Sequence, residues 1–234
     1  LESSKTNPRA TLSKTVASYG SWKSPITADL ITAKTIGLTG HRIDGDDIYW
    51  SEMRPSEQGR YVIMRRTPDG NITECTPPEF SARTRVHEYG GGAFTAHKGV
   101  IYFSNFKDGH LYRQSMDGSP EILTPTEGYR YADIIVDEKR NRLICIREDH
   151  TGEGEAVNNI VSINLNGNDN GTILVAGNNF YSNARLSPDG NKLAYLTWNH
   201  PNMPWDGTEL WVADISEDGT LQNSTLIIGS ASES

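Results

Sequence analysis

Short apolar runs, separated by polar turns, repeat along this chain at a nearly constant spacing. Residues 183–228 show the unit most clearly, as four apolar runs joined by turns rich in Gly, Pro, Asp and Asn. Such turn residues accept the torsions that reverse the chain, so short runs between them are typical of antiparallel strands. The segment therefore predicts four consecutive antiparallel strands.

The same unit occurs four times in the chain. Its third run begins at positions that are 48, 49 and 50 residues apart, namely Ile63, Leu111, Ile160 and Leu210. A constant period with four strands per copy is typical of propeller blades. We predict an all-β fold: a β-propeller of about four four-stranded antiparallel blades that is part of a larger propeller. The predicted blades cover roughly residues 29–78, 85–125, 131–177 and 181–229. The alternative is a β-sandwich in which the spacing is a coincidence.

Both ends of the chain depart from the repeat. Residues 1–20 are polar and rich in Ser and Thr, which predicts a flexible N-terminal tail before a propeller domain at 21–234. Residues 26–38 fit either a short strand or a helical turn. Residues 229–234 fall where a fifth blade would begin, so we expect the chain to stop before further blades.

Composition and charge restrict the partners and the compartment. The net charge is -8, which argues against nucleic acid because basic residues supply most of that affinity. No apolar run is long enough to cross a membrane, so no membrane partner is predicted. Cys75 and Cys145 fall in non-adjacent blades, too far apart to form a disulfide. Reduced cysteines favour a cytoplasmic location.

Three irregular segments, 85–92, 147–155 and 198–207, carry most of the candidate chemistry. Strands of a blade alternate in direction, so these three segments fall on one face of the predicted propeller and the plain turns on the other. Irregular loops on a rigid scaffold usually carry function, so we expect the first face to contact substrate or another domain. The candidate substrate or interface residues are Arg85, His87, Glu88, Tyr89, Arg147, Glu148, His150, Trp198, His200, Trp205 and Asp206.

Each of these segments also has a structural interpretation. The glycines at 90–92 could serve only to let the inner strands converge at the channel. Arg85 and Glu88 could form a structural contact, whereas the functional hypothesis has Glu88 binding the free amine of a peptide. Trp198 and Trp205 could both pack beneath their own loop, or they could form an exposed interface.

No cofactor and no metal site is predicted from the motifs. The glycine run lacks the Gly-Lys-Ser/Thr that follows in a phosphate loop, and His87 lacks the second His of a zinc helix. Residues 166–171 have some likeness to a calcium loop but lack the glutamate at its twelfth position. A metal-dependent propeller enzyme would need converging acidic residues, and only Glu88 and Asp133 lie near the starts of inner strands.

Three longer strings resemble a known family. Residues 19–26, 86–92 and 198–206 together resemble the N-terminal propeller of the prolyl oligopeptidase family, in particular its acylaminoacyl-peptidase and dipeptidyl-peptidase-like branch. The turn at 187–190 and the run after it also resemble the repeat of TolB-type propellers. The resemblance covers about residues 19–229.

The resemblance implies a parent serine peptidase in which the propeller caps a C-terminal α/β-hydrolase domain with a Ser-Asp-His triad. This chain has no Gly-x-Ser-x-Gly nucleophile elbow, so we expect no catalytic residues in it and no activity alone. Its expected role is to gate the access of short peptides to the hydrolase domain. The alternative is a free-standing propeller that binds a protein partner. Strand edges left free by an incomplete ring also make a homo-oligomer a candidate partner.

Overall fold

The structure is a computed structural model that describes residues 16–32 and 35–233. The chain divides into two compact units, Leu1–Thr35 and Ile36–Ser234. In the first unit, helix α1 (Ala28–Thr32) follows Thr27, whose hydroxyl accepts a hydrogen bond from the Leu30 amide at 3.1 Å. This bond satisfies an amide at the start of the helix that has no partner within it. Most of the predicted flexible tail, residues 1–15, lies outside the described residues.

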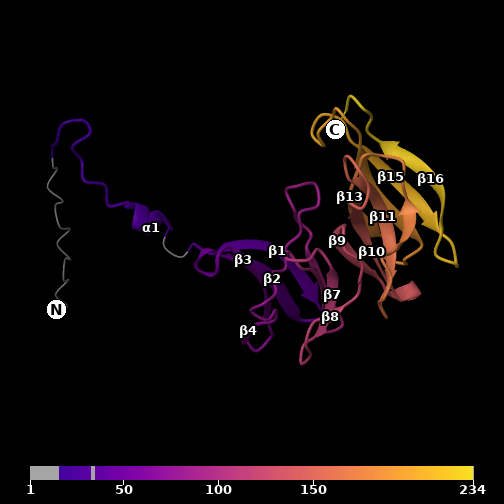
Figure 1. The fold of residues 1–234 in the computed structure, drawn as a ribbon, viewed down its shortest axis with the longest axis horizontal. Helices are drawn as coiled ribbons and strands as arrows, with labels where there is room; N and C mark the ends of the chain where they lie inside the picture. The colour runs from indigo at the N-terminus through magenta and orange to yellow at the C-terminus, as the bar shows by residue number, and fades with distance from the viewer. Residues whose placement is uncertain (1–15, 33–34, 234) are drawn as a thin grey trace, which may run out of the picture. The chain divides into compact units, whose positions relative to one another are not determined.

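The second unit consists of four antiparallel sheets of four strands each, which Figure 1 follows from indigo to yellow. The first sheet contains β1 (Gly37–Asp44), β2 (Asp47–Arg54), β3 (Arg60–Arg66) and β4 (Ile72–Glu74). The second contains β5 (Phe94–His97), β6 (Val100–Ser104), β7 (Leu111–Ser115) and β8 (Glu121–Ile122). The third contains β9 (Tyr129–Asp137), β10 (Arg142–Asp149), β11 (Val157–Asn164) and β12 (Thr172–Val175). The fourth contains β13 (Phe180–Leu186), β14 (Lys192–Trp198), β15 (Glu209–Ile215) and β16 (Leu221–Ile228).

Short 3-10 helices complete the elements, η1 (Pro55–Glu57) after β2 and η2 (Glu138–Arg140) between β9 and β10. Strand order within every sheet follows chain order, and every pairing is antiparallel. The predicted all-β fold with four four-stranded antiparallel blades is therefore confirmed. Residues 26–38, which fit either a strand or a helical turn, contain α1 and the first residues of β1.

The turns between strands are stabilised by one recurring arrangement. In the turn after β13, the Ser187 hydroxyl donates to Asp189 Oδ1 at 2.6 Å, and the same oxygen accepts from the Asn191 amide at 3.1 Å. These hydrogen bonds, the one from Ser187 foremost, lower the pKa of Asp189 to about 2. The turn after β15 uses Ser216 and Asp218 in the same way. In these two hairpins the polar turn residues therefore close the turn through their own side chains.

The innermost strands β1, β5, β9 and β13 contact one another in succession. β1, β9 and β13 each contain one left-handed residue, namely Gly40 (φ 50°), Asp133 (φ 52°) and Asn183 (φ 52°), and Gly92 (φ 58°) lies two residues before β5. The pairing register of β1, β9 and β13 shifts at these points, as in a β-bulge. The Asp133 amide donates to the Gly92 carbonyl at 2.9 Å, and the Asn183 amide donates to Asp133 Oδ2 at 3.0 Å. Gly92 thus has the structural role that the sequence left open.

The hydrophobic core consists of three clusters, and each joins two consecutive sheets. Tyr49 and Ile63 of the first sheet pack with Phe103 of the second. Leu111 of the second packs with Leu143 of the third. The remaining cluster joins the third and fourth sheets. Because each sheet is buried against its neighbours, the loops at the strand ends are held on a rigid base.

The two cysteines are unpaired, and Cys145 is buried in the third sheet. Burial raises the pKa of both thiols, that of Cys75 to about 11, so both stay protonated at neutral pH. No helix in the described part of the chain has the length and apolar character needed to cross a membrane.

Candidate functional site

A cleft of about 810 Å³ opens between four loops of the second unit. Three of them precede β5, follow β10 and follow β14, and the fourth, residues 177–179, precedes β13. Eight of the eleven predicted residues line this cleft: His87, Glu88, Tyr89, Glu148, His150, Trp198, His200 and Trp205. The structure therefore brings the three chemically varied segments together at one place.

Glu148 is the buried acid of the cleft, with 4% of the residue exposed. Its Oε1 accepts a hydrogen bond from the His87 amide at 2.6 Å, and its Oε2 lies 3.0 Å from His150 Nε2. Arg130 Nη1 lies 3.7 Å from the same carboxylate and 3.2 Å from Glu88 Oε1. A buried carboxylate needs such partners to offset its lost hydration. Glu148 therefore fixes the loop that carries His87 and Glu88.

Four aromatic rings form one wall of the cleft. The Phe180 ring stacks on Trp198 with centroids 5.3 Å apart. The His87 ring meets Trp198 edge-on at 5.3 Å, and the His200 ring meets Phe180 edge-on at 4.9 Å. Trp205 lies at the rim with 66% of the residue exposed. The two tryptophans therefore differ: Trp198 packs inside the structure and Trp205 faces outward.

The cleft rim carries two exposed carboxylates. The Glu88 side chain is 80% exposed and the Glu155 side chain is 83% exposed, so both are hydrated acceptors. Glu155 Oε2 lies 3.1 Å from His200 Nε2. The wall and rim together offer an apolar surface for a flat or aliphatic group and negative charges for a cation or amine.

Three predicted residues lie outside the cleft. The Arg85 guanidinium stacks over the Phe106 ring at 4.9 Å, and the Arg85 carbonyl accepts a hydrogen bond from the Glu88 amide. Arg147 is buried, donates to the Asn170 carbonyl at 2.9 Å and lies over the Tyr129 ring. The Asp206 carboxylate accepts a hydrogen bond from the Met203 amide at 3.0 Å. These side chains hold loops in place, and the ionic partner of Glu88 is Arg130 rather than Arg85.

Phe180 and Arg130 belong to the site but were not among the predicted residues. Phe180 begins β13 and Arg130 lies at the start of β9, so both come from strand ends and not from the irregular loops. Neither has a local sequence signal, because the packing of adjacent sheets brings Phe180 to the cleft and Arg130 to Glu88 and Glu148. Among the described residues, no three His, Cys, Asp or Glu side chains gather closely enough to hold a metal ion.

Burial lowers the pKa of His87, while the carboxylates of Glu148 and Asp133 oppose this shift. The folded protein therefore disfavours the charged imidazole, and the unfolded chain binds that proton more readily. The stability contributed by neutral His87 is complete above its unfolded pKa of about 6.5 and is lost as the pH falls below it toward the folded value.

We expect the free energy of unfolding of His87→Gln to fall less than that of the wild type when the pH drops from about 7.5 to about 5.5, because the titrating group is removed. Urea unfolding at both pH values measures this difference. His41→Gln, at an exposed position on β1, is the matched control and should keep the wild-type pH dependence. An unchanged pH dependence in His87→Gln would contradict the expectation.

No protein-family model and no curated protein sequence matches the chain. Among solved structures, puromycin hydrolase superposes with a TM-score of 0.85 and 32% identity over 92% of this chain. A puromycin-hydrolyzing peptidase from Mycobacterium tuberculosis superposes with a TM-score of 0.84 and 34% identity over 94% of this chain. The chain is homologous to the N-terminal propeller of prolyl oligopeptidase-family peptidases.

This homology confirms the family resemblance that residues 19–26, 86–92 and 198–206 indicated. The chain spans 36% of the length of each puromycin-hydrolysing neighbour. Acylaminoacyl peptidase from Pyrococcus horikoshii, at 10% identity and a TM-score of 0.54, shares the fold of the propeller. TolB from Acinetobacter baumannii, at 15% identity and a TM-score of 0.55, shares it too.

Proposed function

We propose that this chain is the non-catalytic propeller of a serine peptidase and that its cleft faces the hydrolase domain and gates the entry of short peptides. The observation that carries this proposal is the convergence of the loops before β5, after β10, before β13 and after β14 on one cleft of about 810 Å³. The homology to prolyl oligopeptidase-family propellers supports it. The two unpaired cysteines support a reducing, cytoplasmic setting for this role.

The proposed division of labour follows from the side chains present. The stacked rings of Phe180 and Trp198 offer a surface for an apolar peptide side chain. The exposed Glu88 carboxylate offers a charge-assisted hydrogen bond to the peptide's free amine. The bond-breaking groups belong to the hydrolase domain, and this chain restricts and orients what reaches them. Puromycin is a first substrate to test, because the neighbours' names specify its hydrolysis.

Glu88→Gln should lower kcat/KM for short peptides with a free N-terminus by about tenfold or more in a longer protein that includes the hydrolase domain. The change removes one charge-assisted hydrogen bond and leaves the size of the side chain unchanged. Steady-state kinetics gives the ratio, and thermal unfolding should show nearly the wild-type melting temperature because Glu88 is exposed.

Two controls make this test specific. N-acetylated peptides lack the free amine, so their hydrolysis should be insensitive to Glu88→Gln. Glu127→Gln removes a charge at an exposed position outside the cleft and should leave both kinds of peptide unaffected. Unchanged kinetics together with a large loss of stability would show that Glu88 serves only its contact with Arg130.

A further inference from the structure

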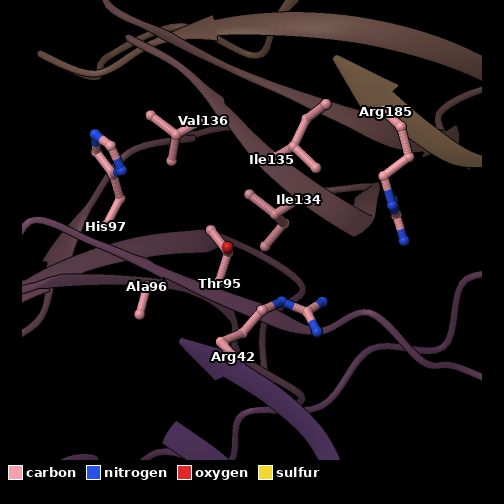
Figure 2. Close-up of a pocket in the computed structure, with 8 residues that line it drawn as sticks. All are labelled: Arg42, Thr95, Ala96, His97, Ile134, Ile135, Val136 and Arg185. Carbon is pink, nitrogen blue, oxygen red and sulfur yellow. The ribbon is translucent and has the colours of Figure 1, made fainter. Parts of the chain in front are cut away.

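A second cavity, of about 340 Å³, lies where the innermost strands meet and shares no lining residue with the loop cleft. Arg42 of β1 and Arg185 of β13 enter it from the first and the fourth sheet. Figure 2 shows the two guanidinium groups approaching the same space from opposite sides. Residues 95–97 of β5 and 134–136 of β9 form the remaining walls.

Neither arginine forms an ion pair with a carboxylate among the described residues. Arg42 Nη1 donates to the His41 carbonyl at 2.8 Å, and Arg185 Nη1 donates to the Ala184 carbonyl at 2.6 Å. A guanidinium has five N–H donors, so most of the donors of both groups remain available. Arg140 provides a contrast, because it pairs with the buried Asp137 carboxylate at 3.3 Å.

The electrostatics of the cavity favour a bound anion. Burial and the positive charge of Arg185 lower the pKa of Arg42, and the nearby Asp133 carboxylate opposes this only in part. Asp133 Oδ2 already accepts a hydrogen bond from the Asn183 amide. Glu138 pairs with Lys98 and lies 3.4 Å from His97. The like charges of the two guanidinium groups are thus left without a carboxylate of their own, in a chain whose net charge is -8.

The remaining walls of the cavity indicate what kind of anion fits. The Thr95 hydroxyl has no hydrogen-bond partner among the described residues, and Figure 2 shows it pointing into the space beside the arginines. The rest of the lining consists of His97 and an apolar wall formed by Ala96 and residues 134–136. Guanidinium groups bind carboxylates through paired hydrogen bonds, and an apolar wall beside them suits an attached hydrocarbon chain.

We infer that Arg42 and Arg185 form a binding site for a carboxylate carried on an apolar chain. A peptide C-terminus and a free short-chain acid both offer this chemistry. The inference does not rest on the proposed gating function, because binding is measured on this chain alone.

Calorimetric titration of the chain with N-acetyl-Ala-Val tests the carboxylate requirement directly. The peptide with a free C-terminus should bind at least about tenfold more tightly than its C-terminal amide, since the amide loses the charge-assisted hydrogen bonds. Pentanoate is titrated in parallel: binding of both acids shows that the carboxylate and its chain suffice, and binding of the peptide alone assigns the site to peptide termini. Equal binding of acid and amide, or no binding of either acid, overturns the inference.

Substitution then assigns the site to the two arginines. Arg42→Gln and Arg185→Gln should each weaken binding of the acid by about tenfold. Arg66→Gln removes the same group at an exposed position of β3 and should retain wild-type affinity. Far-UV circular dichroism verifies folding, and Arg185→Lys, which keeps the charge but loses the planar fork, should give an intermediate affinity. Equal losses in all three Gln variants would mean that net charge, and not this cavity, drives binding.

Discussion

Gly92→Ala should destabilise the second unit by about 3 kcal/mol or more, the sum of a strained backbone and an overpacked contact. Gly92 has φ 58°, and a Cβ there would lie 2.3 Å from Asp133 Oδ1 and 2.8 Å from the Asp133 amide nitrogen. That amide donates to the Gly92 carbonyl across two sheets, so relief of the clash would break the link. Urea unfolding followed by circular dichroism measures the change.

Gly45→Ala separates the two contributions. Gly45 lies in the turn after β1 with φ 60°, nearly the torsion of Gly92, yet no atom lies within 4 Å of its added Cβ. It should therefore lose only the cost of the backbone torsion, about 1–2 kcal/mol. If both variants show the same decrease in the free energy of unfolding, the close approach of Gly92 to Asp133 does not contribute to the loss of stability.

The second large effect is expected at Asp137, whose side chain is 1% exposed. Its carboxylate lies 3.3 Å from Arg140 Nη1 and 2.8 Å from Arg142 Nε. The same arginines donate to carbonyls of the fourth sheet, Arg140 to Gly190 and Arg142 to Gly219, each at 2.8 Å. Asp137→Asn would leave two largely buried guanidinium groups uncompensated, so we expect a loss of about 3–5 kcal/mol in the free energy of unfolding.

The control for this variant is Asp214→Asn. Asp214 also pairs with a cation, Lys192 at 2.5 Å, but both side chains are exposed. Exposed ion pairs contribute little because water and salt screen them, so this variant should unfold at nearly the wild-type urea concentration. A small loss at Asp137, similar to that at Asp214, would show that the third and fourth sheets do not depend on this ion cluster.

Local sequence rules were sufficient to predict the sheets. The recurrence of Ile63, Leu111 and Ile160 in third strands reflects burial between neighbouring sheets. Turn residues such as Asp189 act through short-range hydrogen bonds. Both effects depend on residues close in the sequence or on a regular repeat. The fold class could therefore be inferred without knowledge of any long-range contact.

The candidate site was predicted less completely, because it depends on contacts between sheets. Arg147 and Glu148 were both predicted from the irregular segment 147–155, but only Glu148 lines the cleft. β10 extends to Asp149, and the Arg147 side chain in it donates to the carbonyls of residues 170 and 171. Trp198 was assigned to a loop but is the last residue of β14, which explains its burial. Phe180 lines the cleft and Arg130 contacts Glu88 and Glu148, both from strand ends whose neighbours are defined only once the sheets have assembled.

The left-handed residues in or just before the innermost strands hold the sheets together independently of the loops that line the cleft. The hydrogen bonds of Gly92, Asp133 and Asn183 position neighbouring sheets without any contribution from the connections between second and third strands. Those connections differ in length and sequence among the four sheets, in which they comprise residues 55–59, 105–110, 150–156 and 199–208. The last two line the cleft and can be lengthened or rewritten while the sheets stay in place. The chain is thus a platform for grafting new recognition loops, and residues 199–208 are the segment to exchange first.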